Sequence, residues 1–430
     1  MRVLLVGSGG REHALAWAIA RSPLLTELVA APGNPGIAAF ARCVPVASAD
    51  VAGLVALARA EAIDLVVPGP EAPLVAGLAD AMAAAGIACF GPSAAAARLE
   101  GSKSFTRELA DAAGIPGARW ERFDDAAAAH DFVRRRGAPI VVKADGLAAG
   151  KGVVVAASVA EAEAAIAAMM QGGALGEAGR AVVIEECLDG DEVSLFALCD
   201  GAQAVLLGAA QDHKRLGDGD TGPNTGGMGA VSPPTGFGTP EQEAALDAFV
   251  RPALAEMARR GTPFRGVLFA GLMLTASGPR LIEYNVRLGD PEAQCLLPRL
   301  RSDLLAALAA ACTGRLAEVS LDLAAVASVA VVMAARGYPG EPAAGGAIGL
   351  GAAEAIPGVR VFHSGTASQG GALVAAGGRV LTVCATGPTL GDARDIAYAG
   401  VRAVSWADGI WRGDIGVRAL QAVPARGDVG

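Results

Sequence analysis

The chain has 430 residues, of which 53% are hydrophobic and 18% are charged, and its formal net charge at pH 7 is −9. This acidic balance disfavours a general nucleic-acid or membrane-surface protein, because both of those partners require a large excess of Lys and Arg. No secretory leader is recognisable after Met1 and the seven cysteines form no CxxC pair, so we expect a cytoplasmic globular protein of about three domains.

The first hundred residues alternate short apolar runs with helical stretches, which is typical of a parallel sheet flanked by helices. The strand candidates are residues 3–6, 28–31, 65–68 and 88–91. Residues 7–12 follow the first strand and open a helix, so their free amides could hold a phosphate. Glu12 replaces the third glycine of the dinucleotide motif GxGxxG, and no acidic residue ends the second strand, so NAD is disfavoured. Binding of a sugar phosphate and a turn needed only for packing stay open as interpretations.

A second region begins with a helix that carries Lys103 and continues into strand candidates at 140–143, 152–156 and 182–185. The glycine loop 146–152 resembles a P-loop but has a different spacing, and Gly152 stands where a P-loop has a magnesium-binding Ser or Thr. We interpret it as a hairpin tip that closes over a triphosphate with its backbone amides and Lys151, in preference to an ordinary surface hairpin.

Lys143 stands at the end of an apolar strand candidate. An ammonium group in that position is costly to bury without an anion. A nucleotide phosphate would supply the anion, and a pair with Asp145 is the alternative. The neighbouring glycine loop favours the phosphate.

Long Gly- and Asp-rich connections lie between apolar strands from about residue 187 to residue 325, as expected of loops that line a cleft. The segment 211–229 combines acidic side chains, cations and glycines that permit close backbone approach. We interpret it as a site for a zwitterionic substrate and a phosphate. A disordered linker is the alternative, and the apolar strands on both sides argue against it.

Residues 281–287 alternate as a strand does, which places Glu283, Asn285 and Arg287 on one face. Two oxygen ligands about 7 Å apart along the strand suit Mg²⁺ that bridges nucleotide phosphates. Arg287 could then steady an anionic substrate. A solvent-facing polar row is the alternative, but the turn and acidic residues in 288–292 are typical of an active-site loop.

The largely apolar stretch 323–335 is shorter than the roughly 20 residues that cross a bilayer, so it predicts a buried strand. A Gly- and Pro-rich segment at 337–352 then separates a last stretch with strand candidates at 359–363 and 380–385. No chemistry is predicted for this C-terminal stretch.

Together these segments resemble the phosphoribosylamine–glycine ligase family of the ATP-grasp superfamily over essentially the whole chain. The resemblance rests on the blocks GSGGREHALA at Gly7, PGNPG at Pro32, GPEAPLVAG at Gly69, LEGSKSF at Leu99, KADGLAAGKGV at Lys143, VIEECLDGDEVS at Val183, QDHKRLGDGDTGPNTGGMGA at Gln211, EYNVRLGDPE at Glu283, YPG at Tyr338 and FHSGT at Phe362. The block at Gln211 is specific to this family, whereas the glycine loop and the metal strand are shared more widely in the superfamily.

The resemblance implies an α/β and α+β multidomain fold. Residues 1–100 would form an N-terminal Rossmann-like domain with a parallel sheet, and residues 101–325 a two-lobed ATP-grasp fold. Its small lobe would span about 115–186 and its large lobe about 187–325. Residues 326–430 would form a small mixed C-terminal domain.

The resemblance also implies a set of site residues. ATP would lie between the lobes, held by Lys103, Lys143, Gly150, Lys151, Gly152, the hinge Glu185-Glu186-Cys187-Leu188 and Glu192. Glu283 and Asn285 look like ligands for Mg²⁺ or Mn²⁺, although residues 267–274 lack the further acidic ligand that many ATP-grasp enzymes carry. Glycine would contact Arg287 and Asp212, and 5-phosphoribosylamine would contact Gly9, Gly10, Glu71 and Lys214. The catalytic candidates are Lys143, Lys151, Arg287 and Asp212.

The reaction that this resemblance implies joins glycine to 5-phosphoribosylamine through glycyl phosphate, giving glycinamide ribonucleotide, ADP and phosphate. We expect a monomer without nucleic-acid or membrane partners. The nearest alternative is another ATP-grasp enzyme of purine synthesis that activates formate or bicarbonate, and the block at Gln211 argues against it. A nicotinamide-dependent oxidoreductase and a non-catalytic ATP sensor are more distant alternatives.

Overall fold

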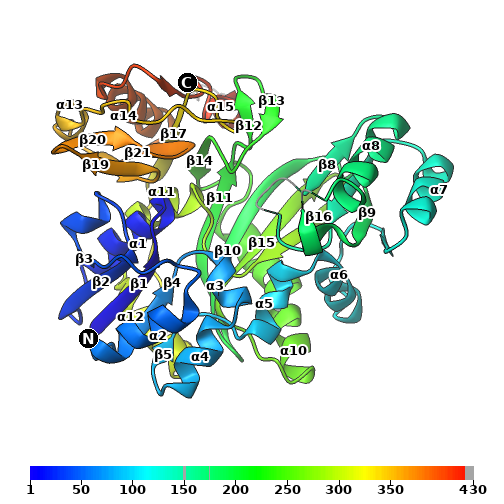
Figure 1. Ribbon diagram of the computed structural model, residues 1–430, viewed down its shortest axis with the longest axis horizontal. Coiled ribbons are helices and arrows are strands. Elements are labelled where there is room, and N and C mark those ends of the chain that lie inside the picture. The colour runs from blue at the N-terminus through cyan, green and yellow to red at the C-terminus, as the bar shows by residue number, and fades with distance from the viewer. Residues whose placement is uncertain (149–151, 174, 422–430) are drawn as a thin grey trace, which may run out of the picture.

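The computed structural model describes residues 1–148, 152–173 and 175–421. Gly150 and Lys151, two of the predicted nucleotide-binding residues, lie outside the described residues. Figure 1 shows a small lobe at the right, a long sheet in the middle, and the N- and C-terminal parts stacked at the left. The expected α/β and α+β multidomain fold class is confirmed.

The N-terminal part is a five-stranded parallel sheet with the strand order β3-β2-β1-β4-β5. Its strands are β1 (Arg2–Gly7), β2 (Glu27–Pro32), β3 (Arg42–Cys43), β4 (Leu65–Pro68) and β5 (Ala88–Cys89), and its helices are α1 (Gly10–Ile19), α2 (Val51–Ala60), α3 (Glu71–Val75) and α4 (Leu78–Ala84). Because side chains alternate along a strand, Val3 packs with Ile19 of α1, whereas Leu4 packs with Leu54 of α2 on the opposite face. The predicted parallel sheet is confirmed. The strand predicted at 88–91 is shorter, as β5, and β3 was not predicted.

The small lobe is an antiparallel sheet with the order β6-β9-β7-β8, covered on one face by two helices. The strands are β6 (Trp120–Phe123), β7 (Ile140–Ala144), β8 (Val153–Ala156) and β9 (Val182–Glu186), and the helices are α7 (Ala126–Arg136) and α8 (Val159–Met170). Ile140 and Val142 of β7 enter the core under the helices. Lys143 therefore lies on the uncovered face of the sheet, which is turned toward the large lobe.

One nine-stranded sheet runs from the large lobe into the C-terminal part. Its main path is β16-β15-β10-β11-β14-β17-β21-β18, and β22 pairs with β17. The strands are β10 (Asp191–Asp200), β11 (Ala204–Asp212), β14 (Gly229–Ser232), β15 (Arg265–Thr275), β16 (Gly278–Asn285), β17 (Ala327–Ala335), β18 (Val359–His363), β21 (Arg379–Gly387) and β22 (Gly409–Ile410). Because of this sheet, the predicted substrate segment at 211–229 lies beside strands of the C-terminal part.

The strand predicted at 323–335 starts four residues late, at Ala327. Leu323 instead forms a bridge with Leu300, and the amide of Ala324 donates to the carbonyl oxygen of Arg299 at 2.7 Å. The first residues of the apolar stretch are thus paired with a different segment.

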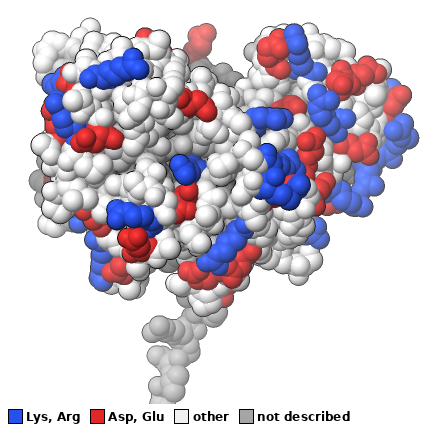
Figure 2. Space-filling model, turned by 90° about the horizontal axis from the view of Figure 1, so that it is seen from below, with Lys and Arg blue, Asp and Glu red and all other residues white. Residues whose placement is uncertain are grey.

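The remaining elements cover the large sheet or project from it. They are α5 (Ala94–Gly101), α6 (Lys103–Ala112), β12 (Arg215–Gly217), β13 (Thr221–Asn224), α9 (Thr239–Ala245), α10 (Arg251–Arg259), α11 (Glu292–Leu296), α12 (Leu304–Cys312), α13 (Gly351–Glu354), β19 (Thr366–Gln369), β20 (Ala372–Ala375), α14 (Leu390–Ala403) and α15 (Val417–Gln421). Within the described ranges, every helix is too short or too polar to span a bilayer. Figure 2 shows acidic and basic side chains intermingled on one face of the molecule.

Candidate active site

Three neighbouring strands form a polar floor between the lobes. In their register, Ser194 of β10 faces Gly271 of β15, which in turn faces Glu283 of β16. Gly271 has no side chain to fill this row, and a Cβ there would lie 3.4 Å from Cγ of Glu283. Glu192 lies on the same face of β10, two residues before Ser194. Asp212 lies on that face of the adjacent strand β11, two residues after Ala210, which pairs with Ser194. The floor therefore presents carboxylates beside an open position.

The predicted metal ligands lie next to each other on this floor. The amide of Asn285 donates to Oε1 of Glu283 at 3.5 Å, and Arg287 donates to Oδ1 of Asn285 at 3.3 Å. Burial raises the pKa of Glu283, but the ammonium groups of Lys103, Lys214 and Lys143 outweigh it and lower that pKa to about 2. Glu283 is therefore an anion surrounded by three lysines that come from three different segments.

The strand that carries these ligands begins and ends earlier than the predicted run 281–287, because β16 spans Gly278–Asn285. β16 ends at Asn285, so Arg287 lies just beyond it. The amide of Val286 donates to the buried carboxylate of Glu100 at 2.8 Å and not to a neighbouring strand. The three polar side chains are nevertheless in contact, as their alternation indicates.

Lys143 is part of a buried charge network on the small-lobe side. Its ammonium lies 2.9 Å from Glu185 and donates to the carbonyl oxygen of Ile282 at 3.3 Å. Arg107 of α6 binds the same carboxylate with two hydrogen bonds, at 2.7 and 2.6 Å. Burial and Arg107 lower the pKa of Lys143, and Glu185 opposes that change. The buried lysine therefore has an anionic partner within the protein.

The alternative partner for Lys143, Asp145, is engaged elsewhere. Its carboxylate accepts from the hydroxyl of Ser104 at 2.9 Å and from that of Ser102 at 3.1 Å. The carbonyl oxygen of Asp145 also accepts from the amide of Lys103 at 2.8 Å. Asp145 thus fixes the start of α6, from which Lys103 faces Glu283.

Arg287 is held between two acidic side chains. Its guanidinium lies 3.0 Å from Glu71 and 3.0 Å from Glu100. The proximity of Arg287 lowers the pKa of Glu71 against the opposing effect of burial. Arg287 and Glu71, which were predicted to contact different substrates, are therefore direct neighbours.

Asp212 ends β11 in an unusual environment. Its Oδ1 is buried and has no hydrogen-bond partner among the described residues. Burial and then the nearby carboxylate of Glu292 raise its pKa well above the usual range. Glu292 is itself 4% exposed and accepts from the hydroxyl of Ser194 at 3.2 Å. Such a pair of buried carboxyls favours a proton or a cationic ligand between them.

Lys214 and Glu192, predicted for the sugar phosphate and the nucleotide ribose respectively, form an ion pair with each other. Burial lowers the pKa of Lys214, but Glu192 and the neighbouring Glu283 raise it above its ordinary value. The ammonium of Lys214 is therefore a fixed positive charge, and its ion pair links the region predicted for the sugar phosphate to the region predicted for the nucleotide ribose.

The glycine loop before α1 already holds carboxylates. The amide of Gly9 donates to Glu12 at 2.5 Å, and the amide of Arg11 donates to Asp290 at 3.3 Å. A Cβ on Gly10 would lie 2.5 Å from the hydroxyl of Ser364. Glu12, the residue that breaks the dinucleotide motif, therefore fills the space under the loop. Gly10 therefore lies directly against Ser364 of the C-terminal part.

The remaining predicted nucleotide residues lie at the connection between the lobes, apart from Gly152, which lies between β7 and β8 of the small lobe. Glu186 ends β9 and accepts from Arg119 at 2.7 Å, and Cys187 and Leu188 follow it. Gly152 is buried and its carbonyl oxygen accepts from the amide of Ala144 at 2.7 Å. The predicted position of the glycine loop between two paired strands is confirmed.

Sequence reasoning missed several charged residues of the site. Arg107, Glu100 and Glu292 lie within or beside predicted motifs, and their burial marks them only once the fold is known. Arg379 and Tyr338 come from the C-terminal part, for which no chemistry was predicted. Arg379 donates to the carbonyl oxygens of Gly226 and Asp290, both at 2.5 Å. No local motif indicates such contacts.

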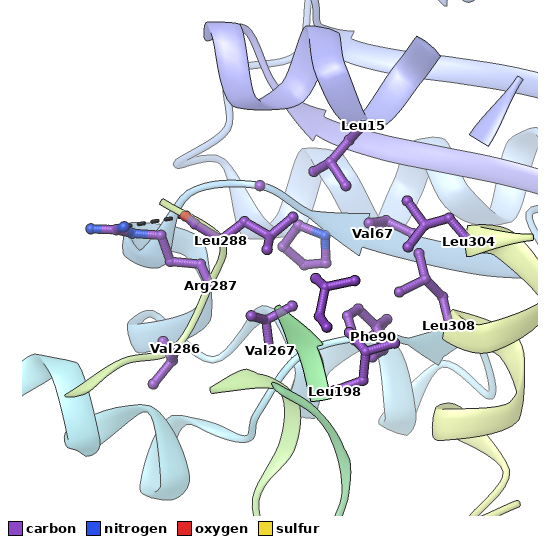
Figure 3. Close-up of a pocket in the computed structure, with 13 residues that line it drawn as sticks. Leu15, Val67, Phe90, Leu198, Val267, Val286, Arg287, Leu288, Leu304 and Leu308 are labelled. Carbon is purple, nitrogen blue, oxygen red and sulfur yellow. Dashed lines mark hydrogen bonds between the residues drawn. The ribbon is translucent and has the colours of Figure 1, made fainter. Parts of the chain in front are cut away.

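A small apolar cavity lies beneath the site, between the N-terminal sheet and the large lobe. Leu15, Phe90 and Leu308 line it together with other apolar residues, and its volume is about 20 Å³, enough for roughly one water molecule. Figure 3 shows the guanidinium of Arg287 pointing away from these apolar side chains, with a hydrogen bond to the carbonyl oxygen of Leu288. The cavity is too small for a substrate.

Comparisons with known proteins match the chain in three consecutive parts. Residues 1–100 match the N domain of phosphoribosylglycinamide synthetase, residues 101–293 its ATP-grasp (A) domain and residues 328–418 its C domain. A phosphoribosylamine–glycine ligase of Rhizobium meliloti (strain 1021) is 56% identical over 420 residues, which covers 98% of this chain and 99% of the relative. The chain belongs to the phosphoribosylamine–glycine ligase family. The resemblance found in the sequence is thereby confirmed.

Solved structures agree with membership in the phosphoribosylamine–glycine ligase family. The crystal structure of such a ligase from Thermotoga maritima has a TM-score of 0.85 and 34% identity, and covers 96% of this chain and 100% of that chain. A biotin carboxylase complex from Campylobacter jejuni has a TM-score of 0.74 at 15% identity, covers 95% of this chain and 92% of that chain, and shows the fold alone. The enzyme is therefore a ligase with the ATP-grasp fold.

Proposed function

We propose that this ligase joins glycine to 5-phosphoribosylamine with ATP, giving glycinamide ribonucleotide, ADP and phosphate. The observation that carries the proposal is the anionic Glu283 on a floor faced by Lys103, Lys143 and Lys214, with the buried acid Asp212 on the same floor. Three cations suit a triphosphate, and a buried acid suits an ammonium group. The names of the relatives support the choice of substrates.

ATP would lie between the lobes with its phosphates toward Lys103 and Lys143. The Glu185–Arg107 network holds Lys143 in place, so the ammonium needs little reorganisation when phosphate arrives. Glu186, Cys187 and Leu188 would contact the adenine, and Glu192 the ribose. Gly150, Lys151 and Gly152 would contact the phosphates.

The residues at the end of β16 fit Mg²⁺. An ionised carboxylate and an amide oxygen are ligands that Mg²⁺ accepts, and it usually completes its shell with substrate phosphates and water. Within the described residues no group of three or more His, Cys, Asp or Glu side chains could hold a metal. The ligands that we propose are the carboxylate of Glu283 and the amide oxygen of Asn285. When bound there, Mg²⁺ would neutralise phosphate charge, and Mn²⁺ would use the same oxygens.

Glycine would bind between Arg287 and Asp212, with its carboxylate toward the guanidinium and its ammonium toward the acid. A carboxylate oxygen attacks the γ-phosphorus of ATP, the bond to the ADP oxygen breaks, and glycyl phosphate forms. The lysines stabilise charge on the phosphoryl oxygens, which is the main demand of phosphoryl transfer. A nucleophilic side chain is unnecessary.

5-Phosphoribosylamine would approach from the side of the N-terminal glycine loop. Its amine attacks the acyl carbon of glycyl phosphate, phosphate leaves, and the nitrogen loses a proton to become the amide. We propose Gly9, Gly10, Glu71 and Lys214 as its contacts. Since Glu12 and Asp290 already occupy two loop amides, the amide of Gly10 and the ammonium of Lys214 are the stronger candidates for the phosphate.

We also propose the domain boundaries 1–100, 101–325 and 326–430, with lobes at about 115–186 and 187–325. The family models match residues 1–100, 101–293 and 328–418, which supports these boundaries.

An ADP-release assay with ATP, glycine and freshly made phosphoribosylamine tests the proposal. Omitting glycine or phosphoribosylamine should reduce sustained ADP release to background. Replacing glycine by formate or bicarbonate should give the same low rate. Full activity with either replacement would refute glycine as the substrate.

A further inference from the structure

The segment between β11 and β14, residues 213–228, forms a closed loop that we call the substrate loop. The amide of His213 donates to Gly229 at 2.9 Å, and that of Thr225 donates to the carbonyl oxygen of Lys214 at 2.8 Å. The hairpin β12–β13 forms its tip. In Figure 1 this hairpin projects from the large sheet and lies beside α15 of the C-terminal part.

A buried arginine from the C-terminal part holds the tip of this loop. Arg412 is 2% exposed and makes two hydrogen bonds to Asp414, both at 2.7 Å. Its Nη1 donates to the carboxylate of Asp220 at 2.7 Å and to the carbonyl oxygen of Arg215 at 3.2 Å. Asp414 in turn accepts from the amide of Gly219 at 2.8 Å. Both residues of the C-terminal pair therefore contact the loop.

Two further residues of the C-terminal part hold the returning limb of the loop. The amide of Gly226 donates to the hydroxyl of Tyr338 at 3.0 Å. Arg379 donates to the carbonyl oxygens of Gly226 at 2.5 Å and Gly227 at 3.3 Å. A Cβ on Gly227 would lie 2.6 Å from Oδ1 of Asp212, so this limb covers the buried acid.

The partners of Arg412 indicate what it is for. Burying a guanidinium costs several kcal/mol unless its donors find acceptors. Every acceptor found for Arg412 belongs either to the loop or to Asp414, which itself binds the loop. Two of its four hydrogen bonds, to Asp220 and to the carbonyl oxygen of Arg215, are therefore made only while the loop keeps this conformation.

We propose that Arg412 is a positioning residue through which the C-terminal domain holds the substrate loop, and with it Lys214, in the geometry that binds the ribosyl substrate. Tyr338 and Arg379 support the same loop from its other limb. The inference rests on the proposed role of Lys214 in substrate binding.

Arg412→Met and Asp220→Asn test the inference from the two sides of one contact. In each variant, hydrogen exchange of the 213–228 amides and tryptic cleavage after Lys214 and Arg215 should accelerate. The KM for phosphoribosylamine should rise about tenfold, because misplacing a binding group costs affinity. The KM for ATP should change much less. Arg412→Lys should recover part of the loss, since it retains the positive charge but not the planar fork of donors.

Arg418→Met is the matched control, because Arg418 also joins the C-terminal part to the large lobe, through Asp191, but has no hydrogen bond or ion pair with the loop among the described residues. It should leave loop exchange and the KM unchanged. Asp220→Asn changes an exposed carboxylate at the tip of the loop, so this variant should fold. It tests the same contact if Arg412→Met does not fold.

Lys214→Met separates the two hypotheses. If it leaves the KM for phosphoribosylamine unchanged, the proposed role of Lys214 fails. If it raises that KM while Arg412→Met and Asp220→Asn leave loop exchange or the KM unchanged, the positioning role of Arg412 is overturned.

Discussion

The two sides of the cleft differ in how their charges are matched. On the nucleotide side, Lys143 and Arg107 share the carboxylate of Glu185, with all three side chains nearly inaccessible to water. On the substrate side, Asp212 has a buried oxygen without a partner in the described structure, and Glu292 has a hydroxyl as its side-chain partner. The nucleotide side is thus preorganised, whereas the substrate side is poised to accept a cation.

This difference indicates a division of work between the sides. A preorganised cation stabilises phosphoryl oxygens without reorganisation during the reaction. An unmatched buried acid instead gains most when a cationic substrate enters, which favours selectivity for an amino acid over a simple carboxylic acid.

Removing a charge on the nucleotide side should cause the greatest loss of activity. Lys143→Ala and Glu283→Ala should each lower turnover about a hundredfold to a thousandfold, because each removes electrostatic stabilisation of the transferred phosphoryl group. Steady-state kinetics, with circular dichroism to check the fold, would measure it. Near-normal turnover in either variant would contradict the proposed site.

A second variant tests whether the nucleotide side is held by its buried pairs. Arg107→Met should destabilise the fold by about 3–5 kcal/mol, since it leaves part of a buried carboxylate unmatched. Arg119→Met, which breaks the exposed pair with Glu186, should cost less than about 1 kcal/mol. Thermal unfolding of the two variants would measure both losses of stability. Equal losses would contradict the claim that buried ion pairs hold the nucleotide side.

A third variant tests the unmatched acid of the substrate side. The folded-state pKa of Asp212 is raised above 3.8, so its contribution to stability is present below that pH and is lost as the pH rises through the folded value. Asp212→Asn should therefore unfold at a higher temperature than the wild type at neutral pH, and the difference should be smaller near pH 4. The variant should also bind glycine more weakly. A variant less stable at neutral pH would show that Asp212 is already matched.

The features that could be predicted from sequence are those encoded locally. The strands β4 (Leu65–Pro68) and β18 (Val359–His363) coincide with their predicted apolar runs. The polar alternation at Glu283 and Asn285, and the position of Lys143 beside a glycine loop, also come from short segments. Such patterns depend on strand periodicity and on the cost of burying charge, both of which can be read along the chain.

The contacts that could not be predicted join distant segments. Arg107 and Glu185 are 78 residues apart in sequence, and Arg412 and Asp220 are 192 residues apart. The same limit explains why Lys214 and Glu192 were assigned to different ligands although they form one ion pair. Pairing of this kind depends on the sheet order, which brings the C-terminal strands beside β14, and no single segment encodes it.

A crystal structure with Mg²⁺ and a non-hydrolysable ATP analogue would show whether the triphosphate binds between the lobes. The triphosphate should lie between Lys143 and the end of β16, with the cation on Glu283 and Asn285 and the terminal phosphate directed toward Arg287. A triphosphate bound elsewhere, for example on the glycine loop before α1, would contradict the account.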